Sequence, residues 1–171
     1  MKRLGVVGAF LLLTALASGG KAPPYHPPTQ AITFSAPLLG GGAISLADYL
    51  GRKPVVLSFW ASWRRPCNDD ADLLERTYQQ YSDRLALIGV SVQDPLENAL
   101  AFASQHNLTF PVALDGNAEV AWLYRVTNLP TTFFIDASGK IVAIHRGPLR
   151  AGQLERYLDL LLAPRAENEA P

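Results

Sequence analysis

The stretch VVLSFWASWRRPC, residues 55–67, decides the fold of this chain. Its first six residues form an apolar run, which is typical of a central strand covered on both faces. From residue 66 onward the side chains that can face a core recur at helical spacing, at Leu73, Leu74, Thr77, Tyr78 and Tyr81. A buried strand, a short turn and an amphipathic helix over about 66–81 are therefore predicted, with Cys67 at the start of the helix.

The rest of the chain alternates between strand and helix patterns. Residues 85–92 repeat the buried-strand pattern. Asp94 is expected to cap a helix that has Pro95 at its first position and Glu97 at its third. The remaining expected elements are a short edge strand over 31–35, a short helix over 46–50 capped by Ser45, a helix over 117–124, strands over 131–135 and 141–145 joined by a hairpin turn, and a C-terminal helix over 154–161. This order predicts an α/β fold, with a mixed four- to five-stranded sheet flanked by helices.

Both ends of the chain differ in composition from this middle part. Residues 1–17 read as a signal peptide, with Lys2 and Arg3 before an apolar run and the small residues Ala15 and Ala17 at the expected cleavage site. Residues 18–30 form a Pro-rich linker, residues 31–163 the folded domain, and residues 164–171 a flexible tail. The leader predicts a periplasmic or secreted protein. Because the apolar run is short for a membrane span, anchoring through an uncleaved leader is kept only as the alternative.

Composition narrows the classes of function. The 171 residues carry 15 basic and 15 acidic side chains, so the formal net charge gives no reason to expect nucleic acid as a partner. The three histidines, at positions 26, 106 and 145, show no metal-ligand spacing, and neither a metal nor another cofactor is expected. Since Cys67 is the single cysteine, no internal disulfide can form.

Several blocks of sequence together resemble a known family. They are residues 55–67, Phe110-Pro111-Val112, LPTTFFID over 129–136, and Gly139-Lys140-Ile141. In this order and spacing they resemble the TlpA/ResA-type thiol–disulfide oxidoreductases of the redoxin (AhpC/TSA-like) superfamily, over roughly residues 31–162. The resemblance implies a thioredoxin-like fold.

The resemblance also implies site residues. In that family a first cysteine at the helix start attacks a substrate disulfide, and a second cysteine three residues later resolves the mixed disulfide. Here Arg64 stands at the attacking position and Cys67 at the resolving position. A guanidinium group is not a nucleophile, so dithiol exchange is expected to be lost. Pro130 matches the family's cis-proline, which exposes backbone groups that hold an extended substrate peptide or, alternatively, serves only the fold. The candidate substrate-binding residues are Trp63, Arg64, Arg65, Pro66, Leu129 and Pro130.

Cys67 and Asp70 each have two interpretations. Cys67 is either a buried, protonated and inert thiol or a reactive one whose pKa the neighbouring Arg64 and Arg65 lower. Asp70 lies where relatives often carry a glutamate that moves protons near the thiols. It is otherwise an ordinary acid in the first turns of a helix, where the helix dipole favours it.

Three hypotheses of function follow. The first is a binding module that uses the groove beside Pro130 to hold extended or cysteine-bearing protein partners. The second is a monothiol redox enzyme, with mixed-disulfide or peroxidase-type chemistry at Cys67. The third is that the attacking cysteine is replaced in this copy only, whereas its near relatives are ordinary reductases. In each case the expected partners are protein thiols, disulfides or extended peptide segments.

Overall fold

The computed structural model describes residues 29–163. The predictions for 1–17 and 164–171, and nearly all of the predicted linker over 18–30, therefore lie outside the described residues. No helix within 29–163 combines the length and the apolar character needed to cross a membrane.

A five-stranded mixed sheet forms the centre of the domain, in the order β5-β4-β3-β6-β7. Its strands are β3 (Val55–Trp60), β4 (Ala86–Val92), β5 (Val112–Asp115), β6 (Thr131–Ile135) and β7 (Ile141–Arg146). The β3–β4 and β4–β5 pairs are parallel, whereas β6 runs antiparallel to both β3 and β7. The expected mixed sheet of four to five strands is confirmed, with β5 as a strand that the periodicity did not predict.

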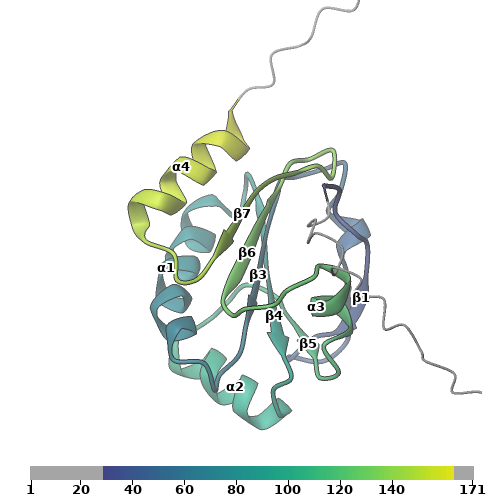
Figure 1. The fold of residues 1–171 in the computed structure, drawn as a ribbon, viewed down its shortest axis with the longest axis vertical. Coiled ribbons are helices and arrows are strands. Elements are labelled where there is room, and N and C mark those ends of the chain that lie inside the picture. Colours follow the sequence, from purple (N-terminus) through teal and green to yellow (C-terminus); the bar gives the residue numbers. More distant parts are fainter. Residues whose placement is uncertain (1–28, 164–171) are drawn as a thin grey trace, which may run out of the picture.

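Helices cover both faces of this sheet. Figure 1 shows α1 (Pro66–Tyr81), α2 (Leu96–Gln105) and α4 (Ala151–Leu162) on one side and α3 (Glu119–Leu123) on the other. Two parallel crossovers in the same direction, β3 to β4 and β4 to β5, place α1 and α2 on one face because such connections are right-handed. Every residue of β3 and β4 is buried, as expected for strands covered on both sides.

Aromatic side chains fill the core on the α3 side of the sheet. Phe59 contacts both Tyr124 and Phe133, with ring centroids 5.5 and 5.6 Å apart, and Phe34 adds an edge-to-face contact to Tyr124. On the opposite face Trp60, the next residue of β3, stacks on Phe102 of α2 at 4.5 Å. The alternation of Phe59 and Trp60 between the two faces follows from the two-residue period of a strand.

The segment before β3 differs from the sequence prediction. A two-stranded antiparallel ribbon forms from β1 (Ser35–Pro37) and β2 (Ala43–Ser45) in place of a single edge strand over 31–35. Gly41 and Gly42, both at positive φ, allow the chain to turn back on itself between the two strands. Only a short 3-10 helix, η1 (Leu46–Asp48), follows, and the Ser45 side chain makes no capping hydrogen bond to it.

The prediction that Asp94 caps the next helix is also wrong in its detail. Helix α2 begins at Leu96, with Pro95 in the N-cap position and no side-chain capping bond. The Asp94 carboxylate instead reaches the turn between β3 and α1, as described below.

Candidate functional site

The turn between β3 and α1 is held by a buried carboxylate. Asp94 accepts hydrogen bonds from the backbone N–H and the hydroxyl of Ser62, both at 2.6 Å, and from the hydroxyl of Ser91 at 3.1 Å. Within the turn, the Arg64 N–H donates to the carbonyl of Ala61, and the Cys67 N–H donates to the carbonyl of Arg64. The backbone geometry around residue 64 is thus fixed by groups other than the side chain at position 64. Sequence reasoning missed this role of Asp94, because it depends on a contact between two separate loops.

Cys67 lies in the first turn of α1 and is only 1% exposed. Burial raises the pKa of its thiol to about 11, and the Asp70 and Asp94 carboxylates act in the same direction. The backbone N–H···S contact at Ala61 and the charge of Arg64 oppose this rise without cancelling it. At neutral pH the sulfur is therefore a protonated thiol shielded from solvent, a state with little nucleophilic character.

Asp70 lies one turn further along α1, and it is also buried. Its Oδ1 accepts a hydrogen bond of 2.6 Å from the backbone N–H of Leu149, in the loop before α4. Its Oδ2 has no hydrogen-bond partner among the described residues. Burial raises the pKa of this carboxyl to about 7, with a further contribution from the charge of Asp69, while the Leu149 N–H acts against the rise.

A small cavity of about 10 Å³ connects these buried groups. Its lining includes Cys67, Asp70 and Trp60, and the Trp60 indole N–H, like the Asp70 Oδ2, lacks a partner among the described residues. The space is close to the minimum that one water molecule needs, and the two unpartnered atoms are a donor and an acceptor. The structure thus brings together Cys67 and Asp70, as the sequence predicts, but in a closed interior.

Arg64 extends from the turn toward the loop that precedes β6. Its Nη2 donates to Asn128 Oδ1 at 2.9 Å and to the carbonyl oxygen of Leu129 at 3.4 Å. Its guanidinium carbon lies 5.8 Å from the ring centroid of Trp63. The next peptide bond, Leu129–Pro130, is cis. The side chain of Arg64 therefore joins the α1 turn to the proline loop.

A groove of about 720 Å³ opens beside Arg64 and is called here the Trp63–Trp122 groove. Trp63 and Trp122 line it, and their side chains are 56% and 78% exposed. Its other lining residues are Arg64, Val92, Gln93, Asn117, Ala118, Glu119, Ala121, Leu123, Val126, Thr127, Asn128 and Leu129. A large, open and mainly apolar surface with a few polar groups is typical of a ligand-binding site.

The predicted substrate-binding residues separate into two groups. Trp63, Arg64 and Leu129 line the groove, whereas Arg65, Pro66 and Pro130 are absent from its lining. Sequence reasoning missed Trp122. Trp122 could have been found from the helix predicted over 117–124. The apolar pattern of that helix directs Val120, Leu123 and Tyr124 inward, so Trp122 is left on the outer face.

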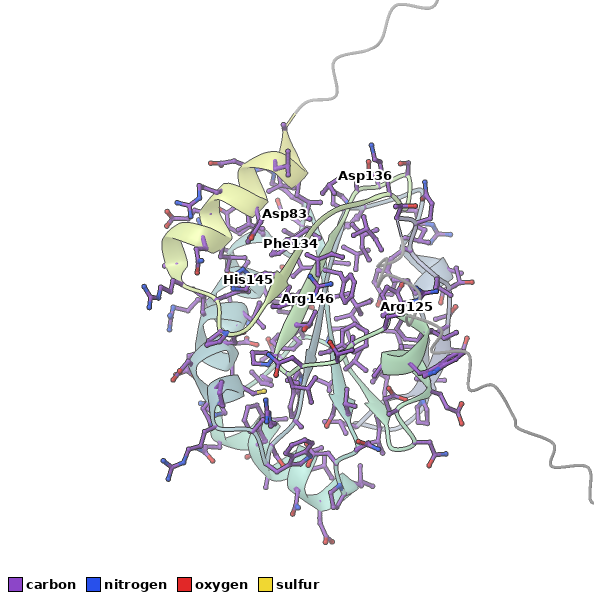
Figure 2. All side chains as sticks on the ribbon, viewed as in Figure 1. Asp83, Arg125, Phe134, Asp136, His145 and Arg146 are labelled. Atoms are coloured by element: carbon purple, nitrogen blue, oxygen red, sulfur yellow. The ribbon has the colours of Figure 1, made fainter. Side chains whose placement is uncertain are left out.

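Outside the groove, the two histidines within residues 29–163 connect structural elements. His106, the residue after α2, contacts Asp72 and Asn68 of α1, at 2.8 and 3.2 Å. His145 of β7 lies on the side of the sheet where α4 packs (Figure 2), within 3.3 Å of the Tyr157 hydroxyl. Among residues 29–163, histidine, cysteine and acidic side chains form no group of three or more suited to a metal ion.

The comparison with family models decides the family. The AhpC/TSA family model matches residues 27–144, which include the β3–α1 turn, the groove and all of the sheet except the end of β7. The chain belongs to the AhpC/TSA family.

Curated relatives place the chain among the thioredoxin-like members of the AhpC/TSA family. It is 37% identical to the thioredoxin-like protein YneN of Bacillus subtilis over 137 residues, covering 77% of this chain and 78% of YneN. It is 34% identical to the thiol–disulfide oxidoreductase ResA of Bacillus thuringiensis over 130 residues, covering 75% of each chain. This chain is thus a member of the thioredoxin-like thiol–disulfide oxidoreductases.

Solved structures agree with a thioredoxin-like fold. A thiol:disulfide interchange protein of the thioredoxin family from Chlorobium tepidum superposes with a TM-score of 0.69 at 25% identity, covering 82% of this chain and 99% of that one. StoA from Bacillus subtilis superposes with a TM-score of 0.65 at 28% identity, covering 77% and 99%. The predicted thioredoxin-like fold is confirmed.

Proposed function

We propose that this chain is an extracytoplasmic, thioredoxin-like protein that binds extended protein segments in the Trp63–Trp122 groove and does not perform dithiol exchange. The observation that carries the proposal is the position of Arg64. Its guanidinium lies between the α1 turn and the carbonyl of Leu129, at the edge of the groove, while the single thiol is buried.

Exchange chemistry demands an exposed thiolate, and neither residue of this turn supplies one. Arg64 has no nucleophilic atom, and Cys67 is both shielded and held protonated by its raised pKa. Binding demands only an accessible surface with hydrogen-bonding groups. The groove offers two exposed tryptophans and the guanidinium of Arg64 at its edge, whereas the carbonyl of Leu129 is already engaged by Arg64.

The second candidate is a monothiol redox enzyme that works through Cys67. One observation favours it: the Arg64 charge lowers the thiol pKa. Burial, the larger effect, acts in the opposite direction, and such an enzyme would have to open the α1 turn before every reaction. The binding function is therefore the better supported of the two.

Two measurements test the proposal. In the first, native protein is titrated with an aromatic disulfide reagent that releases a coloured thiolate. We expect Cys67 to react only after denaturation, and rapid reaction of the folded protein would support the monothiol enzyme instead.

The second measurement is insulin reduction by the wild type and by Arg64→Cys. We expect no activity from the wild type. Activity gained by Arg64→Cys would indicate that the remainder of the exchange site is intact and that one side chain removed the function. Wild-type turnover at the rate of a dithiol reductase would overturn the proposal.

Export is the remaining part of the proposal, and it rests on the leader pattern of residues 1–17. Expression of the full chain in a Gram-negative host, followed by fractionation, tests it. We expect a shortened product in the periplasmic fraction. A full-length product that stays with the membrane after carbonate washing would favour an uncleaved anchor.

A further inference from the structure

The charged groups of the Trp63–Trp122 groove are few and come from two different elements. Arg64 belongs to the turn before α1, and Glu119 is the first residue of α3. Arg65, the next residue of the chain, is exposed but does not line the groove. Asp94, the nearest buried carboxylate of the turn, already accepts three hydrogen bonds from Ser62 and Ser91. The formal charges of the lining residues Arg64 and Glu119 cancel, and the neighbouring Arg65, outside the lining, adds one positive charge.

The guanidinium of Arg64 is held in place by some of its N–H donors, and its other donors remain available. Of its five N–H donors, those on Nη2 are directed to Asn128 and Leu129. Within residues 29–163 both side-chain hydrogen bonds of Arg64 come from Nη2, so Nε and Nη1 have no acceptor there, and the side chain is half-buried. A charged donor group that is fixed through Nη2 and open at Nη1 is suited to bind a carboxylate through a charge-assisted hydrogen bond.

Apolar surface lies next to this donor group. Trp63 and Trp122 are large side chains left exposed by the fold, and Val92, Val126 and Leu129 also line the groove. Exposed aromatic residues around a hollow are typical of sites that take up an apolar side chain of a partner.

We propose that the groove selects extended protein segments in which an acidic side chain stands next to a large apolar one. This inference rests on the proposed binding function and names its ligand class. The carboxylate pairs with Arg64 at the place where relatives present their attacking thiol, and the apolar side chain packs against Trp63 and Trp122. Recognition of a cysteine is thereby replaced by recognition of a negative charge.

The test uses full-length protein and an immobilised array of octapeptides, acetylated and amidated so that a side chain is their only carboxylate. The central pair is X-Phe, with X as Asp, Glu, Asn, Gln, Lys or Ala, and the flanking positions are randomised among residues without a carboxylate. We expect peptides with Asp or Glu at X to bind roughly tenfold more tightly than peptides with Asn or Gln, the size of effect that a charge-assisted hydrogen bond gives. The preference should weaken as salt rises.

Variants assign the preference to its residue. Arg64→Gln should abolish the tenfold difference between acidic and amide peptides while retaining the weaker binding common to both. Arg76→Gln is the matched control, because it removes the same charge from an exposed position further along α1. Arg76→Gln should keep the full preference.

The outcomes separate the two proposals. Binding of all peptides with equal affinity, or an acidic preference that survives Arg64→Gln, would overturn this inference and leave the binding function standing. The absence of binding to every peptide would overturn the binding function and this inference with it.

Discussion

Cys67 and Asp70 lie one turn apart on α1, and both are buried in the same small cavity. The thiol has a raised pKa because it is desolvated, and the carboxyl has a raised pKa for the same reason. Near neutral pH this interior therefore contains a protonated thiol and a carboxyl that is close to its titration midpoint. The titratable group that can change charge under ordinary conditions is Asp70 and not the cysteine.

Asp70 should make the stability of the protein depend on pH. Its pKa is about 7 when folded and near 3.8 when unfolded, so between these values the folded state holds the extra proton. The free energy of unfolding is then expected to fall as pH rises from about 4 to about 7, by on the order of 2–4 kcal/mol. Asp70→Asn keeps an acceptor for Leu149 and removes the charge, and it should abolish most of this slope.

Urea unfolding of the wild type and Asp70→Asn at several pH values between 4 and 8 measures the effect. Asp83→Asn is the control, because Asp83 is an exposed acid after the end of α1 and does not contribute to the raised pKa of Asp70. The same slope in wild type and Asp70→Asn would show that another group is responsible.

At the scale of single residues, the sequence identified Cys67 and Asp70 but not the buried environment in which they lie. Asp70 reads as a typical acid of a first helical turn, and its burial depends on the loop at Leu149, 79 positions away. The helix dipole argument is correct for an exposed acid, but it contains no information about which face of the helix another segment will cover.

At the scale of the elements, the β3–α1 unit was predictable because both halves have strong periodicity. The apolar run of β3 and the helical spacing of α1 are local properties, and each appears in the structure within a residue of its expected position. The capping of α2 was predicted wrongly, because the same Asp94 serves a tertiary contact instead of its own helix. A carboxylate that follows a strand can cap the next helix or bind another loop. Here the position of the Ser62 loop determines which of the two roles Asp94 has.

Asp94 should therefore contribute more to the stability of the β3–α1 turn than to that of α2. Asp94→Ala removes the acceptor of three hydrogen bonds and leaves a buried serine hydroxyl and a backbone N–H without a partner. We expect a loss of about 2–4 kcal/mol in the free energy of unfolding. We also expect Cys67 to react with thiol reagents severalfold faster under native conditions, because the turn that shields it is no longer tied down.

Chemical denaturation and the native thiol titration check this prediction together. Glu97→Ala is the matched control, since it removes an exposed acid from the first turn of α2 without touching the β3–α1 turn. Unchanged thiol reactivity in Asp94→Ala would contradict the role given to the Ser62 contact.

At the scale of the whole molecule, the groove is assembled from segments that are far apart in the chain. One wall comes from the turn at Trp63 and the other from α3 and the loop that leads to Leu129. The fold class followed from the sequence, with β5 and the β1–β2 ribbon as the elements that it missed. The groove did not, because its second wall depends on how α3 lies against the sheet.

Trp122 should contribute to binding and little to stability. Its side chain is 78% exposed, so Trp122→Ala should change the free energy of unfolding by less than about 0.5 kcal/mol. The fluorescence increase of an apolar dye such as bis-ANS should fall severalfold if the groove is the main dye site.

Leu160→Ala is the control for this variant, because Leu160 is 56% exposed on α4 and is not part of the groove. Equal dye binding by the two variants would indicate that the exposed tryptophans do not form the main apolar surface.

The Asp94–Ser62 contact has a consequence for how such proteins diversify. Because that contact and backbone hydrogen bonds hold the turn, we expect that residue 64 can be exchanged without loss of the scaffold. Position 64 is thus a site where evolution, or a saturation library, can convert one redox scaffold into a set of receptors with different chemical preferences.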